Sequence, residues 1–467
     1  MNKTVIKGLT CLAVPAVILL FPTPQGLSSD AWRLFAFYIG AIVGLVLRPL
    51  PEPVVLLTAL AGISLLFNKT SVALAGFASP TSWLVFSAFL VGQCFIDTGL
   101  GRRIAFMLID RMGQTSLRLG YAAALTDLIL SPATPSNTAR SGALVFPIFQ
   151  SVVVTLDSHP GETAKRIGSY MMLALFQISL VTSTLFITAN AVHGLTIAFA
   201  KNILYLDITW MQWATAMLPP GLILLAIIPW LIYKLQPPTI TTIDNKAIAE
   251  KGLKELGPMT FKEKMLTFLF VLATIGWATG SITKIDSTAV AIGFITFCLI
   301  TGVVNWSSLL KSHGAWSTLI WYAGILSFAD ALSKAKFFDW LGKLIGSTVN
   351  FTEMNQTVVL LGILFISVIV RYFFASSAAY VSSFIPVLMS IGVAAQLPPM
   401  MLALILGVSS MMGSLLTHYG NGAAPILFGS GYVNQATWWK TGHIVAILGI
   451  FVYLIIGLPL WKIMGIF

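Results

Sequence analysis

The chain has 467 residues, of which 57% are hydrophobic and 9% are charged, and its mean hydropathy is +0.89. A soluble globular protein carries about 25% charged residues, so this chain has too few to cover an ordinary water-facing surface. The composition excludes a soluble globular fold and makes the lipid bilayer the expected surroundings. A net charge of +11 would suggest nucleic acid in a soluble protein, but here the cations fall mostly in short loops between apolar segments. We therefore expect no nucleic-acid partner.

The first apolar segment follows a basic start, MNKTVIKGLTCLAVPAVILLF, as a signal peptide does. It lacks a small-residue cleavage site and many apolar segments follow it, so we interpret it as a retained first helix. The three cysteines, Cys11, Cys94 and Cys298, lie far apart in hydrophobic stretches. Their spacing fits neither a metal site nor a disulfide framework, so we expect no metal and no cofactor.

A helix that crosses a bilayer needs about 20 apolar residues. Eleven segments approach this length, at roughly 5–21, 31–49, 53–67, 81–98, 168–188, 212–234, 263–281, 288–304, 316–332, 398–416 and 441–463. Two further regions, 117–156 and 355–396, are apolar but broken midway by polar, proline or small residues. Each is predicted to enter the membrane and return. The sequence therefore predicts an all-α polytopic membrane protein with about 11 transmembrane helices and two re-entrant hairpins.

The placement of lysine and arginine predicts the orientation, because cytoplasmic loops retain these residues. With a cytoplasmic N-terminus, that side receives most of the cations, including the six lysines of segment 234–264. The trio Lys334, Lys336 and Lys343 falls on the other side and argues against this orientation. The absence of a transit peptide favours a bacterial inner (plasma) membrane over an organelle envelope. We predict a multi-pass protein of the cell membrane.

A polar linker at 235–262 divides the chain into comparable halves, 1–234 and 263–467. We expect this linker to be cytoplasmic. The first half holds SPATPSNTARSG and then LVTSTLFITANAVHG, and the second holds FFASSAAYVSS and then LLTHYGNGAAPILFGSG. Each half thus has an interrupted hairpin followed by an interrupted span. Because five crossings separate corresponding elements, the halves should be oppositely oriented, which is the inverted repeat of many secondary transporters.

Irregular backbone at membrane depth is tolerated where protein or a water-filled cavity covers it. The alternative is that Pro132, Pro135 and residues 420–422 simply kink ordinary spans. Kinks would leave unexplained the hydroxyl and amide side chains that gather at the same places. The four breaks therefore favour a binding site.

The first hairpin tip reads Ser136-Asn137-Thr138, and these residue types cap helix starts. They could be caps and nothing more. Alternatively, the N–H groups and hydroxyls at the start of the returning half-helix bind a carboxylate, because a helix N-terminus bears about half a positive charge. Four converging half-helix ends would offer about two positive charges, which matches a dianion. The predicted substrate-binding residues come from both tips and both interrupted spans: Ser136, Asn137, Thr138, Ser376, Ser377, Thr188, Asn190, Thr417, Ala424 and Pro425.

Three motifs, SPATPSNTAR, FFASSAAYVSSFIPV and LLTHYGNGAAPILFGSGYV, resemble the divalent anion/sodium symporter family. They are most similar to its 2-oxoglutarate/malate and citrate/succinate translocator branch, and the resemblance covers nearly the whole chain. It implies an elevator-type homodimer that carries di- or tricarboxylates, with a scaffold domain and a moving transport domain that holds both hairpins.

The paired Ser-Asn-Thr signature of this family is complete at 136–138. In the second half it carries over only at Ser376, because Ser377 and Ala378 replace the Asn and Thr. Sodium-coupled members coordinate sodium at both tips, so the loss of an amide and a hydroxyl disfavours sodium coupling. If sodium is used, the resemblance places it near Ser136, Asn137 and Ser376.

Two cations bear on the coupling. Arg140 lies one helical turn after Ser136 on the same face, and His418 lies within the second span break. Ionisable residues inside a membrane are functional candidates, and a fixed cation could replace sodium and make the protein an anion exchanger. Arg140 could instead pair with Asp127, and His418 could be a packing residue. Arg371 precedes the second tip with no acid placed opposite, and it could snorkel to the membrane surface.

The sequence predicts a secondary active transporter of C4–C5 dicarboxylates such as malate, succinate and 2-oxoglutarate, working as an anion exchanger. The alternative is a sodium-coupled dicarboxylate symporter. An enzyme would need a convergent acid–base pair or metal cluster, and no HExxH or GxSxG motif is present. A channel is a further alternative, but closed hairpin tips suit an occluding site better than an open pore. The expected partners are small dicarboxylates, lipid and a second copy of the chain.

Overall fold

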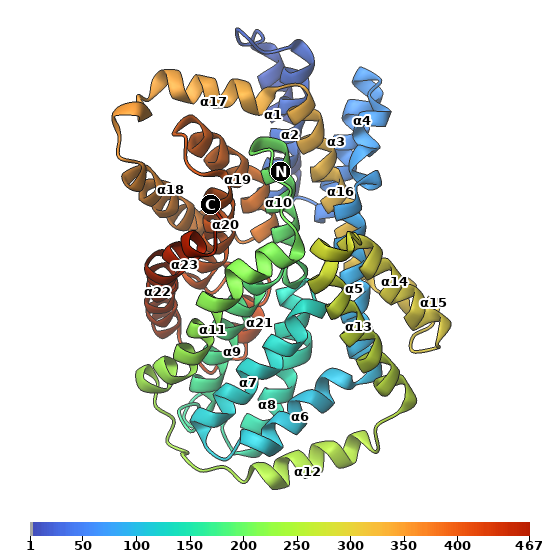
Figure 1. Cartoon of the computed structure of the whole chain (residues 1–467), viewed down its shortest axis with the longest axis vertical. Helices are drawn as coiled ribbons and strands as arrows, with labels where there is room; N and C mark the ends of the chain where they lie inside the picture. Colours follow the sequence, from blue (N-terminus) through green and yellow to red (C-terminus); the bar gives the residue numbers. More distant parts are fainter. Residues whose placement is uncertain (1–2) are drawn as a thin grey trace.

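The computed structural model describes residues 3–467, which form helices and no strand; Thr115 and Thr242 make one isolated bridge. Figure 1 shows the helices in chain order: α1 (Lys3–Leu20), α2 (Ser29–Leu47), α3 (Glu52–Phe67), α4 (Thr70–Leu74), α5 (Pro80–Thr98), α6 (Leu100–Met112), α7 (Ser116–Leu130), α8 (Phe146–Thr155), α9 (Gly168–Leu185), α10 (Ala191–Ile203), α11 (Trp210–Leu235), α12 (Asn245–Leu256), α13 (Phe261–Thr283), α14 (Ser287–Ile300), α15 (Trp306–Leu310), α16 (His313–Lys334), α17 (Phe337–Thr348), α18 (Gln356–Val370), α19 (Ser377–Ala394), α20 (Pro399–Met412), α21 (Ala424–Gly429), α22 (Gln435–Val452) and α23 (Leu458–Ile463). Short 3-10 or π segments are η1 (Ala75–Ala78), η2 (Ser131–Ala133), η3 (Thr138–Val145), η4 (Ile187–Ala189), η5 (Phe351–Glu353), η6 (Arg371–Phe373), η7 (Gly413–Leu415) and η8 (Tyr453–Gly457).

The predicted all-helical class is confirmed, and every predicted span overlaps a helix. Eight described helices are long and apolar enough to cross a membrane, and four shorter ones are apolar. The number of crossings stays a prediction. Among the helices that the sequence analysis did not predict, α6, α10 and α17 have 12 or 13 residues each. They are too short for the 20-residue criterion that found the spans.

Polar side chains fix the starts of several long helices. Thr209 and Gln212 form a capping box at the start of α11, and Thr260 and Glu263 form one at the start of α13. Each box satisfies backbone N–H groups that have no partner within the helix. The apolar segments therefore begin where the hydrophobic windows predicted them.

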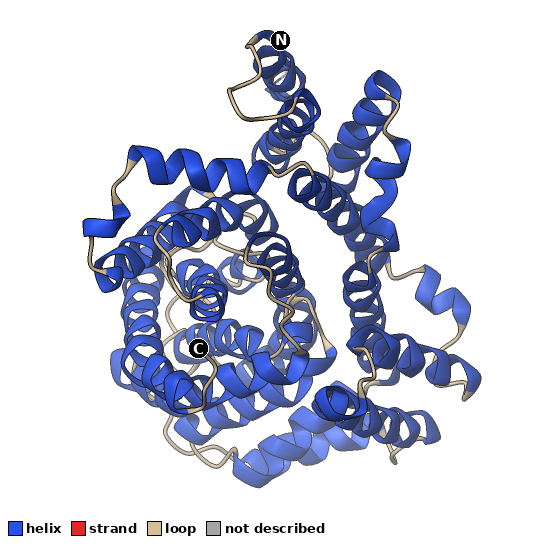
Figure 2. Cartoon of the chain, turned by 45° about the horizontal axis from the view of Figure 1, so that its top comes forward, coloured by secondary structure: helices blue, strands red, loops and turns tan. Residues whose placement is uncertain are grey.

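Apart from α6, α12 and α17, the helices form two groups. The outer group comprises α1–α5 and α13–α16, which pack on one another through α16. The hairpin group comprises α7–α11 and α18–α23, with α9 and α20 inside it. Figure 2 shows a rounded bundle that contains the C-terminus and a curved row of helices beside it that contains the N-terminus. Each half of the chain contributes first to the outer group and then to the hairpin group.

The linker predicted at 235–262 contains a helix, α12. Asn245 at its start donates hydrogen bonds to the carbonyls of Ile109 and Asp110 at the end of α6, at 2.9 and 2.7 Å. Gly252 leaves room for Phe106, because a Cβ at this glycine would lie 2.5 Å from the ring. The linker is therefore held against α6 rather than extended through solvent.

Candidate functional site

The first hairpin consists of α7 and α8 joined by an irregular tip. Pro132 and Pro135 have no backbone N–H, and α7 gives way to the short turn η2 before the tip. Ser136 Oγ accepts the Ala139 N–H at 3.1 Å and caps the returning segment. That segment starts as the π-helix η3 and continues as α8. Ser136 therefore stands at the start of the returning helix.

The other two tip residues face different neighbours. Asn137 Nδ2 donates to the Ser179 carbonyl at 2.9 Å and to Ser183 Oγ at 3.0 Å, both on α9. Asn137 Oδ1 is buried and has no partner within residues 3–467. A Cβ at Gly422 would lie 2.2 Å from Thr138 Oγ1. Thr138 thus touches the second interrupted span, at a position that requires glycine.

Arg140 is fully buried, and each of its three guanidinium nitrogens has a partner. Nε donates to Asp127 Oδ2 at 3.2 Å, which makes an ion pair between the two arms of the hairpin. One terminal nitrogen donates to the carbonyls of Thr134 and Ala189, at 2.8 and 3.0 Å. The other donates to Ser183 Oγ at 2.7 Å. Arg140 therefore ties the tip to the first interrupted span, and Asp127 compensates its charge.

The first interrupted span is α9, the turn η4 and α10. Ala191 N–H donates to the Pro135 carbonyl at 2.8 Å and joins this break to the first tip. Asn190 caps α10 with its side-chain oxygen and extends its amide towards Met411. The Thr188 hydroxyl accepts the Trp210 indole N–H at 3.1 Å. Of the two predicted residues here, Thr188 is thus engaged by an aromatic neighbour, while Asn190 lies between the two halves of the span.

The second hairpin consists of α18 and α19. Ser376 Oγ accepts the Ala379 N–H at 3.2 Å and donates to Glu52 Oε1 at 3.2 Å. Glu52 belongs to α3 of the outer group and also lies 3.3 Å from Arg48. Ser377 Oγ accepts a hydrogen bond from a neighbouring arginine at 3.1 Å. The second tip therefore offers two hydroxyls, and one of them contacts an outer-group carboxylate.

That arginine, Arg371, is 1% exposed and does not snorkel. Its terminal nitrogens donate to the Ser376 carbonyl at 3.4 Å, to Ser414 Oγ at 2.6 Å and to the Gly420 carbonyl. The guanidinium lies 4.9 Å from the centre of the Tyr380 ring. Nε is buried without a partner, and no carboxylate pairs with Arg371 in the described part of the chain. Arg371 is thus a buried cation that hydroxyls, carbonyls and a ring surround.

The second interrupted span breaks between α20 and α21. Asn421 Oδ1 accepts the N–H groups of Ala423 and Ala424, at 2.8 and 2.9 Å, and so starts the short helix α21, which has Pro425 in its first turn. Thr417 Oγ1 and Asn421 Nδ2 are buried without partners among the described residues. This loop therefore carries spare donors and acceptors.

Both hairpin tips reach this loop. Thr138 of the first tip contacts Gly422, and Arg371 of the second tip donates to Gly420. Two tips that are far apart in sequence thus meet within three residues of one loop. Of the predicted residues, Thr138 lies against this loop, Ser376 and Ser377 are linked to it through Arg371, and Thr417 and Ala424 flank it in the chain.

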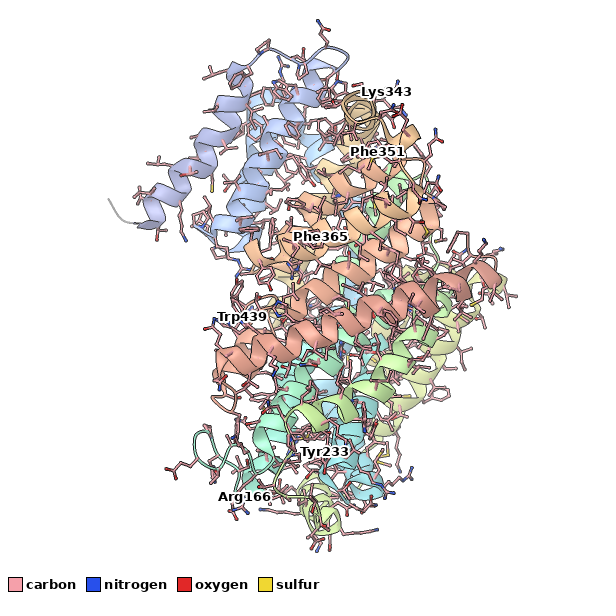
Figure 3. All side chains as sticks on the ribbon, turned by 90° about the vertical axis from the view of Figure 1, so that its left-hand side faces the viewer. Arg166, Tyr233, Lys343, Phe351, Phe365 and Trp439 are labelled. Atoms are coloured by element: carbon pink, nitrogen blue, oxygen red, sulfur yellow. The ribbon has the colours of Figure 1, made fainter. Side chains whose placement is uncertain are left out.

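His418 lies in the same loop but has an aromatic setting. Its Nδ1 accepts the Trp439 indole N–H at 3.0 Å, and its ring centre lies 4.6 Å from that of Phe428. Figure 3 shows Trp439 on α22, which runs across the hairpin group. Aromatic neighbours thus surround His418, and one of its ring nitrogens is engaged by Trp439.

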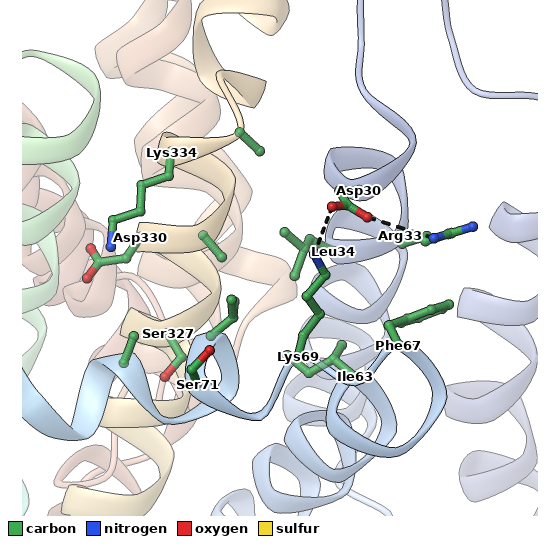
Figure 4. A pocket seen from close by; sticks show the side chains of 14 residues that line it. Asp30, Arg33, Leu34, Ile63, Phe67, Lys69, Ser71, Ser327, Asp330 and Lys334 are labelled. Carbon is green, nitrogen blue, oxygen red and sulfur yellow. Dashed lines mark hydrogen bonds and ion pairs between the residues drawn. The ribbon is translucent and has the colours of Figure 1, made fainter.

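Two of the cavities that adjoin the outer group are lined by charged residues. One of 380 Å³, here called the tip cavity, lies between the first tip and the outer group. The other, of 470 Å³, is enclosed by α2–α4 and α16 (Figure 4). There Lys69 Nζ lies 2.9 Å from Asp30, and Lys334 points towards Asp330. Each lysine of this second cavity thus faces a carboxylate.

Sequence reasoning missed the role of Glu52, which lies between two prolines in RPLPEPVV and is 324 residues from its partner Ser376. It noted Arg371 but left its side chain free to reach the membrane surface. The sequence did contain one indication that Arg371 is unusual: no acidic residue stands opposite it in the hairpin. No local pattern pointed to Glu52.

The fold and the site define a polytopic membrane protein in which two polar hairpin tips meet inside an apolar helical bundle. The family model described as the sodium:sulfate symporter transmembrane region matches residues 2–467, and the chain belongs to this transporter family. The predicted resemblance to divalent anion/sodium symporters is thereby confirmed.

Several relatives match over nearly their full length. Inner membrane protein YbhI of Escherichia coli K12 is 43% identical over 99% of this chain and 98% of its own. The proposed malate transporter YflS of Bacillus subtilis is 38% identical over 98% and 96%. The L-tartrate/succinate antiporter of Escherichia coli K12 is 34% identical over 97% of both chains. The YdaH transporter of Alcanivorax borkumensis, a crystal structure with an unusual topology, shares the fold with a TM-score of 0.61 at 12% identity, over 100% and 99% of the two chains.

Proposed function

We propose that the protein exchanges small dicarboxylates of C4–C5 size, such as malate, succinate and 2-oxoglutarate, across the bacterial cell membrane. The observation that carries the proposal is the meeting of two hydroxyl-bearing hairpin tips beside Arg371, a buried cation without a carboxylate partner in the described chain. The names of YflS and of the tartrate/succinate antiporter support this substrate class. On this proposal the protein is not an enzyme and uses no cofactor.

The substrate would bind through the donors at the tips. Ser136 and Ser376 stand at helix starts, where backbone N–H groups and the helix dipole favour an anion. Moving a bare dianion into hydrocarbon costs tens of kcal/mol, so donors and a positive charge must replace its water. Arg371 supplies that charge at the second tip, where Ser377 and Ala378 stand in place of an amide and a hydroxyl.

We expect exchange of anions rather than net uptake, because the binding site would carry a net positive charge when it is empty. Asp127 compensates Arg140, and Trp439 engages a ring nitrogen of His418, so the proposal assigns the fixed charge to Arg371. A cation without a counter-ion is costly to carry through the bilayer. The loaded site has its charge matched by substrate and crosses readily, whereas the empty site does not. Uptake would then depend on carboxylate inside.

The hairpin group would move as a body against the outer group, as in an elevator, within a homodimer whose N-termini face the cytoplasm. Contacts between the groups, such as the Ser376–Glu52 and Asn202–Asp330 hydrogen bonds, would break during the movement. Both bonds join partly buried side chains, and a further bond between the groups, from the Tyr38 hydroxyl on α2 to the Ser382 carbonyl on α19, is buried and would break as well.

A sodium-coupled dicarboxylate symporter is the second candidate. The family description favours it, as do three buried oxygens that have no partner among the described residues: Asp127 Oδ1, Asn137 Oδ1 and Thr417 Oγ1. Oxygen atoms are the ligands that hard cations take in proteins. Sodium would then lie between the first tip and the second break.

Uptake into proteoliposomes separates the two candidates. We expect radiolabelled succinate or malate to enter vesicles loaded with dicarboxylate, with or without sodium, and not to enter empty vesicles. Sodium-driven accumulation in empty vesicles would establish the symporter instead. Background uptake of malate, succinate, 2-oxoglutarate and citrate under all conditions would refute both.

A further inference from the structure

The tip cavity has walls from both helix groups. Ser136 and Thr138 of the first tip line one side, and Gln93, Lys311 and His313 line the other. The last two lie where α15 meets α16, in the outer group. Its 380 Å³ falls at the small end of the usual range for ligand pockets, about 300–1,000 Å³. It suits a small molecule that contacts both groups at once.

Arg140 of the first hairpin also lines this cavity and pairs with Asp127, whereas the lysine on the outer-group side has no carboxylate beside it in the described chain. Lys311 and His313 are exposed, and neither forms an ion pair within residues 3–467. The acid on the adjoining helix α5, Asp97, accepts hydrogen bonds from Gln93 at 2.6 Å and from Ser308, and it does not line the cavity. The cavity of Figure 4 differs, because its lysines face Asp30 and Asp330. The tip cavity is therefore positive on the outer-group side.

We propose that the tip cavity is an entry subsite in which a dicarboxylate spans the two groups. One carboxylate takes the hydroxyl donors of the first tip, and the other pairs with Lys311 of the outer group. This inference rests on the proposed function and adds to it a residue outside the hairpins. Lys311 acts as a positioning residue that favours a second carboxylate and so selects di- over monocarboxylates.

Because Lys311 belongs to the outer group, it should affect substrate binding from only one membrane face. If the hairpin group moves against the outer group, Lys311 stays behind and the substrate leaves it. Lys311 then assists binding from one membrane face, the cytoplasmic one in the proposed topology. A residue that merely supports the fold would alter transport from both faces alike.

The test measures succinate exchange in proteoliposomes that hold the protein in one orientation, with the half-saturating concentration determined separately for each face. We expect Lys311→Gln to raise this concentration about fivefold on the cytoplasmic face and to leave the other face and the maximal rate unchanged. Added salt should raise the wild-type value on that face and have a smaller effect on the variant. Lys311→Arg should behave as wild type, and Lys343→Gln, at an exposed lysine of α17, is the matched control.

The possible results distinguish failure of the entry-subsite proposal from failure of the proposed function. If the wild type exchanges succinate but Lys311→Gln matches it on both faces, or changes both faces equally, the entry subsite is wrong and the proposed function stands. If the wild type moves no dicarboxylate, the proposed function itself is overturned. A melting temperature equal to that of the wild type is expected for Lys311→Gln, because its side chain is exposed and has no ion pair in the described chain.

Discussion

The Arg140 guanidinium lies 3.2 Å from the Asp127 carboxylate, and the two residues stand on opposite arms of the first hairpin. Arg371 lies on the other arm of its hairpin, before the second tip, and it likewise donates to the tip and to the adjoining span break. No carboxylate accompanies Arg371 within residues 3–467. The two hairpins thus use arginine in the same way to fix a tip, and they differ in net charge.

Asp127→Ala should destabilise the protein severely, because it leaves the Arg140 charge buried and unpaired. Breaking a buried pair from one side costs about 3–5 kcal/mol. The double variant Asp127→Ala/Arg140→Met should melt above Asp127→Ala in a detergent thermal-unfolding assay. If the decrease in melting temperature of the double variant equals the sum of the decreases for Asp127→Ala and Arg140→Met alone, the two residues are not coupled.

Loss of a tip hydroxyl or amide should weaken transport. Ser136→Ala, Asn137→Ala and Ser376→Ala each remove a polar group at a tip, which costs about 1–3 kcal/mol, or roughly 5- to 150-fold in half-saturating concentration. Uptake kinetics measure this effect. Ser151→Ala is the control, since this hydroxyl on α8 bonds to its own helix at Ile148. Equal effects in the tip and control variants would argue against binding at the tips.

Arg371→Gln should relax the requirement for internal carboxylate, because the empty site would no longer carry an uncompensated charge. We expect slower exchange together with measurable uptake into empty vesicles, whereas Arg371→Lys should keep the requirement. Arg166→Gln, at an exposed arginine, serves as the control. If Arg371→Gln still exchanges at the wild-type rate with no net uptake, the fixed charge lies elsewhere.

The Ser376–Glu52 contact should depend on transport state. Glu52→Cys and Ser376→Cys, combined in a chain without native cysteines, should be joined by a short bifunctional thiol reagent, since the native side chains lie 3.2 Å apart. The chain is cleaved at a site between positions 52 and 376. Cross-linking is then detected on a gel, because the two fragments migrate together when they are joined. Saturating dicarboxylate should reduce the cross-linking, because transport would move position 376 of the hairpin group away from position 52 of the outer group. Cross-linking that substrate leaves unaffected would show that the two groups are not separated by transport.

The two hairpins should open to opposite membrane faces. Cysteines introduced at Thr115 and Met354, beside the first and second hairpins, should each react with an impermeant thiol reagent from one side, and the sides should differ. Labelling is measured in intact cells and in inverted vesicles. Reaction of both positions from the same side would contradict the predicted inverted repeat.

The helices could be predicted from sequence because lipid-facing segments need long apolar runs, and the two breaks in each half stood out against them. Ser136 could be recognised as a cap, because capping is a local property of a few residues. The contact of Glu52 with Ser376 could not be predicted, since it joins residues 324 positions apart and leaves no local pattern. The same holds for Lys311, which lines one cavity with the first tip although the two are far apart in sequence.

Helix α9 is buried along its whole length, yet it must enter the membrane before the helices that enclose it, α11, α20 and α22, have been synthesised. Four of its hydroxyls can be satisfied while α9 is still surrounded by lipid, because they donate to carbonyls of their own helix: Ser179 to Phe176, Thr182 to Ser179, Ser183 to Ser179 and Thr184 to Val181. Biogenesis therefore constrains which polar groups this helix can carry. A hydroxyl that folds back on its own helix can be delivered early and engage Asn137 or Arg140 once the first hairpin docks.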